Sequence, residues 1–309
     1  VSKMGWQEIN IRKYSAEVKK NLNIELSDEI VEKDLILTLI LAEFEKRDLG
    51  KELIFKGGTL LSRNYLKYHR FSEDLDFVYK DSSKLREMNR SAREKIIKSF
   101  IDVFCTTLKS ICDELGLDFN LDRSNKKYCR IMHPRLVYTF KVYYSEDKFI
   151  KVEINFFEKL FYETPEVSVK SITEFFDSKK LLENLNLTYE NFKVKSYSLE
   201  EIKLEKYRAI LTRKYFQERD LFDLFLIKDS LNADINLITE KIKNSSLIKR
   251  DLTKLINEKL ILLQNNSFFE SKEKVENLSI IQYDKKEFEE FKEKIKPILI
   301  EICHKFLAE

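Results

Sequence analysis

Two adjacent glycines, Gly57 and Gly58, constrain the local fold of this chain more than any other feature. The 309-residue protein has only five glycines, and this pair follows the apolar run 53–55 and precedes a segment with a helical pattern. A Gly-Gly turn lets the backbone approach a ligand closely with its N–H groups exposed, and a following helix N-terminus favours phosphate. The sequence therefore predicts a tight turn and a following helix beside a site for an anionic group.

A pair of acidic residues follows in the next segment. Asp74 and Asp76 stand at i and i+2 within 74–79, whose composition is typical of a strand. Alternation along a strand places both carboxylates on one face, about 6.5 Å apart along the chain, with Leu75 and Phe77 on the other. Two carboxylates placed in this way can share one or two magnesium ions.

A predicted hairpin offers a third carboxylate. Residues 135–144 and 149–157 both alternate between apolar and polar positions, with a turn at 145–148 between them. In the second strand Glu153 falls on the polar face. A two-metal site needs a further carboxylate from a neighbouring strand, so Glu153 is the candidate, and a plain surface glutamate is the alternative.

Before Pro165, the expected helices are residues 27–47, 60–68 and 84–115. The chain beyond Pro165 is expected to be almost wholly helical, with helices at 237–263 and 285–307 and a last strand near 192–197. Pro297 lies inside the last of these helices and predicts a kink or a junction of two helices.

A further charged block begins in the helical segment that opens at 198–201. On an unbroken helix Lys206, Arg213 and Asp220 would lie within about 40° of one another. Glu218 would then fall in the apolar arc, which predicts a break near 217–218. A helix face with solvated charges is the alternative interpretation.

Composition excludes several functional classes. The net charge of +3 does not by itself indicate a nucleic-acid partner. The four cysteines and three histidines have neither zinc-ligand spacing nor a nucleophilic-triad pattern. Cys105 and Cys112 are seven apart in a helical pattern, which predicts core positions. No apolar run reaches the length of a membrane span and no signal-peptide pattern is present, so we expect no membrane association and a cytoplasmic location.

Taken together, the motifs resemble the nucleotidyltransferase superfamily, whose signature is a Gly-Gly-Ser/Thr turn followed by an Asp-x-Asp strand. Two further segments, Arg-Phe-Ser-Glu-Asp-Leu-Asp at 70–76 and Lys-x-x-Ala…Arg…Arg-Asp-x-x-Asp-Leu at 206–224, resemble the AbiEii/AbiGii toxin family, which includes the MenT toxins. The resemblance extends to about residue 230. It implies an α/β (α+β) fold with a mixed sheet flanked by helices, a catalytic core over 1–165 and a mainly helical domain over 166–309 that completes the nucleotide cleft.

The resemblance also implies roles for individual residues. The implied catalytic residues are Asp74, Asp76, Glu153, Lys206 and Asp220, of which Asp74, Asp76 and Glu153 would bind metal. The implied nucleotide-binding residues are Lys56, Gly57, Gly58, Thr59, Arg63, Ser72, Lys206, Arg213, Arg219 and Asp223.

The implied reaction is Mg²⁺-dependent (or Mn²⁺-dependent) transfer of a nucleotide from an NTP to an RNA acceptor, the tRNA 3′ end, by a toxin that a cognate antitoxin protein restrains. Two alternatives stay open. One is transfer to a protein or small-molecule hydroxyl, and the other is a catalytically silent protein that binds a nucleotide or an antitoxin.

Overall fold

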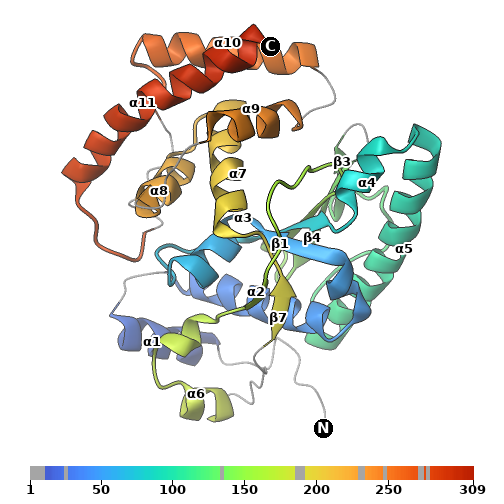
Figure 1. The fold of residues 1–309 in the computed structure, drawn as a ribbon. Coiled ribbons are helices and arrows are strands. Elements are labelled where there is room, and N and C mark those ends of the chain that lie inside the picture. Colours follow the sequence, from blue (N-terminus) through green and yellow to red (C-terminus); the bar gives the residue numbers. More distant parts are fainter. Residues whose placement is uncertain are drawn as a thin grey trace. The chain divides into compact units, whose positions relative to one another are not determined.

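The chain forms two compact units (Figure 1). The computed structural model describes residues 11–23, 27–132, 136–184, 192–228, 234–245, 249–270, 275 and 279–309. The first unit contains residues 1–157 and 164–197, and the second contains 158–163 and 198–309. The division differs from the predicted boundary at residue 165, because residues up to 197 contact the first unit.

The first unit is built on a five-stranded mixed sheet in the order β1-β2-β5-β4-β3. The strands are β1 (Leu53–Lys56), β2 (Asp74–Tyr79), β3 (Cys129–Met132), β4 (Val137–Tyr143) and β5 (Phe149–Asn155). Strand β2 pairs antiparallel with β1 and parallel with β5, and β4 pairs antiparallel with both β5 and β3. The predicted α/β class and the predicted β4–β5 hairpin are confirmed, while residue 135, where that hairpin was expected to begin, lies outside the described residues. The sequence did not predict β3.

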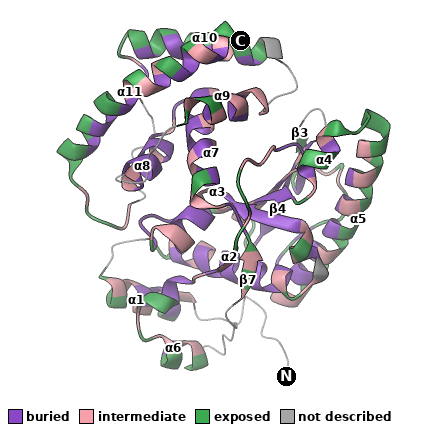
Figure 2. Cartoon of the chain, in the orientation of Figure 1, coloured by how far each residue is buried: buried purple, intermediate pink, exposed green. Residues whose placement is uncertain are grey.

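Aromatic residues join one face of this sheet to two helices, α2 (Asp28–Glu45) and α5 (Arg90–Leu115). The ring of Phe44 on α2 lies 5.8 Å from that of Phe77 on β2 and 5.6 Å from that of Phe104 on α5. Figure 2 shows α2 buried along most of its length. Burial of this apolar face leaves the opposite face of the strands to the polar residues, as the alternation in β2 predicted.

Local sequence signals set the ends of these helices. The Ser27 hydroxyl accepts a hydrogen bond from the backbone N–H of Ile30 and so caps α2. The Asn89 side chain caps α5 at Ala92, and Gly116 ends α5 in the left-handed conformation at φ 71°. The cap at Asn89 divides the predicted helix 84–115 into α4 (Ser82–Glu87) and α5.

Smaller elements complete the first unit. They are α1 (Ile11–Leu22), η2 (Asp48–Glu52), α3 (Gly57–Leu60), the π-helical turn η3 (Leu61–Tyr65), β6 (Glu166–Ser168), η4 (Ile172–Phe175), α6 (Lys179–Asn184) and β7 (Lys193–Lys195). Strand β7 falls in the predicted strand 192–197 and pairs with β6, which was not predicted. Just after β7, Ser196 forms a β-bridge with Phe55 on β1, so this segment lies at the edge of the five-stranded sheet.

The second unit is helical. Its helices are α7 (Leu199–Thr212), α8 (Glu218–Leu226), α9 (Ile235–Lys243), α10 (Lys249–Gln264) and α11 (Lys285–Ala308). The predicted break near 217–218 is confirmed, because α7 ends at Thr212 and α8 begins at Glu218. The expected single helix 237–263 is two helices, whereas Pro297 lies inside one helix, so the junction expected there is absent.

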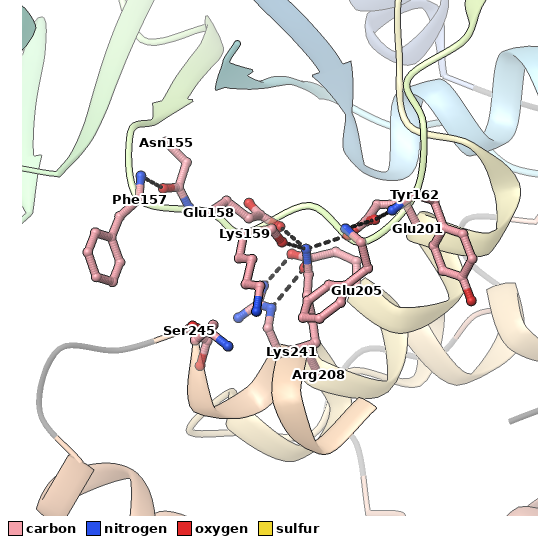
Figure 3. Close-up of polar contacts among 12 residues, drawn as sticks. Asn155, Phe157, Glu158, Lys159, Tyr162, Glu201, Glu205, Arg208, Lys241 and Ser245 are labelled. Atoms are coloured by element: carbon pink, nitrogen blue, oxygen red, sulfur yellow. Dashed lines mark hydrogen bonds and ion pairs between the residues drawn. The ribbon is translucent and has the colours of Figure 1, made fainter. Parts of the chain in front are cut away.

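A buried ion cluster fixes the segment 158–163 within the second unit (Figure 3). Lys241, 2% exposed, donates to Glu201 Oε1 at 2.7 Å and to the Lys159 carbonyl oxygen at 2.9 Å, and it pairs with Glu158 Oε1 at 2.9 Å. The other oxygen of Glu201 accepts from the backbone N–H groups of 161–162. Burial alone would lower the pKa of Lys241, but the surrounding carboxylates raise it above its ordinary value.

Candidate active site

A row of charged side chains crosses the sheet on its polar face. Asp76 on β2 is the register partner of Lys56 on β1 and of Glu153 on β5. Register partners on adjacent strands point to the same face. Asp74 lies two residues before Asp76 on that face, and its own partner on β5 is Lys151. The register therefore places the three expected acidic residues on one face of the sheet, together with a lysine.

Lys151 is the residue of this row that sequence reasoning missed. Its Nζ lies 2.8 Å from Asp74 Oδ2, and both side chains are about one-third exposed. The signal that could have found it is its position two residues before Glu153, which alternation assigns to the same face. Its partner could not have been read from the sequence, because that depends on the parallel register between β2 and β5.

The charges of the row shift one another's pKa values. The pKa of Asp76 is raised from 3.8 to about 6, chiefly by burial and also by the charges of Glu153 and Asp74, while Lys151 and Lys56 oppose the shift. Burial lowers the pKa of Lys151, but Asp76 and Asp74 outweigh it and the net shift is upward. The carboxylates are therefore held close enough to interact strongly, with cations on both sides.

The Gly-Gly turn lies directly against this row. Gly57 adopts φ +84°, and a Cβ at this position would collide with the carboxylate of Asp76. A Cβ on Gly58 would lie 2.6 Å from Arg70 Nη2 and 3.0 Å from Ser72 Oγ. Only glycine leaves room for these side chains. The two sequence motifs therefore form a single site.

Backbone contacts fasten the turn to the acidic strand. Thr59, 2% exposed, donates its hydroxyl to the Asp74 carbonyl oxygen at 2.5 Å. The Ser62 hydroxyl donates to the carbonyl oxygen of Arg70, whose Nη1 donates to the Phe71 carbonyl oxygen at 3.0 Å. The Thr59 hydroxyl thus positions the turn.

The helix after the turn is shorter than the expected helix 60–68. It consists of one α-helical turn followed by one π-helical turn, so its dipole is smaller than that of the expected helix.

Two cations assigned to nucleotide binding are buried in the protein. Arg63 is 1% exposed, and its guanidinium donates to Thr38 Oγ1 at 2.9 Å and to Asp34 Oδ1 at 2.7 Å, both on α2. An NTP would have to break this buried ion pair to reach Arg63, so its contacts favour a structural role. Lys56 is 6% exposed and lies over the ring of Tyr197 with its Nζ 5.9 Å from the centroid.

The charged block of the second unit is also assembled. Lys206 Nζ lies 2.9 Å from Asp220 Oδ1 and 2.6 Å from Asp223 Oδ2, and Arg213 Nη1 lies 3.0 Å from Asp220 Oδ2. Burial raises the pKa of Asp220, but Lys206 and Arg213 outweigh it and bring the pKa below its ordinary value. Arg219 is half-buried in the first turn of α8. This ionic arrangement contradicts the alternative of a solvated helix face for Lys206 and Asp220.

A cavity of about 730 Å³ lies elsewhere in the second unit. Its lining includes Tyr207, Phe225, Phe291, Ile295 and Ile298. None of the predicted site residues is among those that line it. Because its lining lacks all of these residues, the cavity is not the candidate active site.

Comparison with models of protein families identifies the family of the chain. A model of the nucleotidyl transferase AbiEii toxin, type IV toxin–antitoxin system, matches residues 39–303. The chain belongs to the AbiEii nucleotidyltransferase toxin family. As a member of this family it is a nucleotidyltransferase, with an NTP as substrate and a cognate antitoxin as partner.

Two solved structures are similar to the chain at low identity. MenT4, a nucleotidyltransferase toxin from Mycobacterium tuberculosis H37Rv, is 14% identical with a TM-score of 0.48, and the match covers 94% of this chain and 98% of that one. A STING-associated CdnE c-di-GMP synthase from Capnocytophaga granulosa is 13% identical with a TM-score of 0.18, over 97% and 98% of the two chains. No curated protein matches the sequence significantly. The family assignment rests on the family model.

Members of the AbiEii family typically use a divalent metal, and the donors of this site suit one in chemistry. Asp74, Asp76 and Glu153 offer the hard carboxylate oxygens that Mg²⁺ and Mn²⁺ prefer. Within the described residues, however, no three His, Cys, Asp or Glu side chains are gathered closely enough to hold a metal ion. Asp74 pairs with Lys151 instead. The donor set therefore fits a metal once the ion pair between Asp74 and Lys151 is broken.

In the described residues, no helix is both long and apolar enough to cross a bilayer.

Proposed function

We propose that this AbiEii-family enzyme transfers a nucleoside monophosphate from an NTP to the 3′ end of an RNA, specifically tRNA. The observation that carries the proposal is the row of Asp74, Asp76 and Glu153 on one sheet face, with the Gly57–Gly58 turn packed against it. Carboxylates beside a Gly-Gly turn suit a metal-bound triphosphate. Mg²⁺ is the proposed metal, and Mn²⁺ is an acceptable substitute.

Asp74, Asp76 and Glu153 would hold the cation. When bound, it would neutralise charge on the triphosphate and on the departing pyrophosphate. The Gly57–Gly58 turn and Ser72 bind the phosphates. Because Asp76 lies directly against Gly57, any nucleotide held by the turn lies beside the carboxylates.

In the proposed reaction, the hydroxyl oxygen of the acceptor attacks the α-phosphorus, and the bond to the β-phosphate oxygen breaks. Pyrophosphate carries away the electron pair, and Glu153 assists the loss of the hydroxyl proton. Lys206 neutralises the charge that develops on the pyrophosphate. The resemblance of segment 206–224 to the AbiEii/AbiGii toxins supports nucleotide-binding roles for Arg213 and Asp223 as well.

The RNA acceptor follows from the resemblance of segments 70–76 and 206–224 to the AbiEii/AbiGii toxins. A toxin must modify a component on which growth depends, and a tRNA whose 3′ end is extended cannot be aminoacylated. The same reasoning supports a cytoplasmic site of action.

The test is to incubate the purified protein with each labelled NTP in turn, Mg²⁺ and total RNA, and to identify the labelled species. We expect label in the tRNA band, its loss with EDTA, and its loss with Asp76→Ala. Asp147→Ala, which removes an exposed carboxylate from the β4–β5 turn, is the matched control and should label like wild type. Label on protein or on a small molecule would overturn the RNA acceptor, and label that survives Asp76→Ala would overturn the site.

A further inference from the structure

The ion pair between Lys151 and Asp74 bears on when the site can accept a metal. The two residues are register partners on the parallel strands β5 and β2, so the backbone holds their side chains side by side. Nζ lies 2.8 Å from Oδ2, a normal charge-assisted hydrogen bond. The pair is therefore a product of the sheet register and not of a chance surface encounter.

An ammonium at this distance competes directly with a divalent cation. A carboxylate oxygen binds Mg²⁺ at about 2.0–2.1 Å, so the metal and the ammonium would occupy the same side of Asp74 and repel each other. Metal binding at Asp74 thus requires Lys151 to leave.

We propose that Lys151 is a positioning residue that competes with the divalent cation for Asp74, so that the site takes up metal together with an NTP and not metal alone. This inference rests on the proposed metal site. The lysine side chain is a flexible stem with a compact charge, so it can leave Asp74 without a backbone change. The phosphates of the NTP supply the anion that it would otherwise lose.

The neighbouring strand provides a matched control. Lys141 on β4 is the register partner of Lys151 and points to the same face of the sheet. Its Nζ lies over the ring of Phe149, 4.2 Å from the centroid. Lys141 therefore carries the same charge on the same face, but its described contact is with an aromatic ring and not with Asp74.

The experiment measures Mn²⁺ binding by calorimetry without nucleotide, and then with a non-hydrolysable NTP analogue, in wild type, Lys151→Met, Lys151→Arg and Lys141→Met. We expect Lys151→Met to bind Mn²⁺ alone at least about tenfold more tightly than wild type, because the competing charge is gone. Lys151→Arg keeps that charge and should stay within about threefold of wild type, as should Lys141→Met. The analogue should tighten Mn²⁺ binding strongly in wild type and much less in Lys151→Met.

A second readout guards against misfolding. In EDTA, Lys151→Met should melt lower than wild type, since three carboxylates lose a counter-charge, and Mn²⁺ should raise its Tm more than it raises that of wild type. Equal Mn²⁺ affinity in wild type and Lys151→Met would overturn the role of Lys151. An equal gain in Lys141→Met would reduce it to a general charge effect, which also contradicts the proposal. Failure of wild type to bind Mn²⁺ even with the analogue would instead refute the metal site of the proposed function.

Discussion

The carboxylate of Asp76 lies where the side chain of any residue other than glycine at position 57 would begin. Gly57 also has a positive φ, which L side chains rarely adopt. The turn that would bind phosphate and the strand that would bind metal are thus in van der Waals contact, and neither can move without the other.

Gly57→Ala should therefore damage catalysis more than folding. The new Cβ pushes Asp76 away from its position, and displacement of a reacting group by about 1 Å can cost about 100-fold in rate. The loss of stability should be about 1–3 kcal/mol, from the strained φ. Initial rates of nucleotide transfer and urea unfolding measure the two effects. Gly58→Ala, whose Cβ would lie nearest to the side chains of Arg70 and Ser72, should lose less activity, and the reverse order would contradict this account.

The raised pKa of Asp76 predicts how stability depends on pH in metal-free protein. An acid whose pKa rises on folding, here from 3.8 to about 6, binds more protons in the native state between these values. Its contribution to stability is therefore lost as the pH rises from about 4 to about 6. Asp76→Asn should be as stable as wild type near pH 4 and more stable, by about 1–2 kcal/mol after allowance for partial exposure, at pH 7.5. Urea unfolding in EDTA at both values checks the sign.

The buried pair of Arg63 and Asp34 should prove structural. Arg63→Met leaves the carboxylate of Asp34, 2% exposed, without its counter-charge, and such a loss typically costs about 3–5 kcal/mol. The double variant Arg63→Met with Asp34→Leu removes both charges and should recover most of that stability. It should also bind Mg²⁺–NTP like wild type. A double variant that is folded but binds NTP at least tenfold more weakly would show that Arg63 contributes to nucleotide binding.

Lys206→Ala should weaken NTP–Mg²⁺ binding with RNA absent, because we propose that Lys206 contacts the triphosphate and not the acceptor. Lys206→Arg should not restore binding fully, since a planar guanidinium does not replace a compact ammonium between Asp220 and Asp223. Calorimetry with NTP–Mg²⁺ measures both, and Lys214→Ala, an exposed lysine of the same unit, is the control. Wild-type binding in both Lys206 variants would confine the nucleotide site to the N-terminal motifs.

Growth offers a test in cells. Expression of the wild-type chain without its antitoxin should slow bacterial growth, and the Asp76→Ala form should not, because it lacks a carboxylate of the proposed metal site. Equal expression of the two forms must be verified by immunoblot. Growth inhibition that does not depend on Asp76 would mean that the chain acts by binding and not by nucleotide transfer.

Short-range features of the fold and site followed from sequence. The turn at 57–58, the facing of Asp74 and Asp76, the break before Glu218 and the burial of Cys105 and Cys112 each depend on periodicity or on one residue's conformational preference. Such signals act within a few residues. They are therefore present in the sequence itself.

Features that depend on partners distant in the sequence could not be predicted from it. The parallel pairing of β2 with β5 sets Lys151 beside Asp74, and no local pattern encodes that register. The family resemblance implied a nucleotide contact for Arg63, but its ion-pair partner Asp34 on α2 lies 29 residues away in the sequence. Strands β3 and β6 were not predicted, because their four and three residues show no clear alternation.

Residues 158–163 belong to the second unit although residues 164–197, which follow them in the sequence, belong to the first. This arrangement has a consequence for synthesis on the ribosome. Strands β1, β2 and β5 are complete once residue 155 has emerged, so the acidic face can form early. Glu158 must wait for Lys241 to be translated before its charge can be buried. Premature termination near residue 197 would therefore release a chain that keeps its carboxylates but leaves an acidic loop unanchored, without the Lys206 block. The order of translation thus places the proposed metal ligands first and the proposed phosphate-binding lysine afterwards.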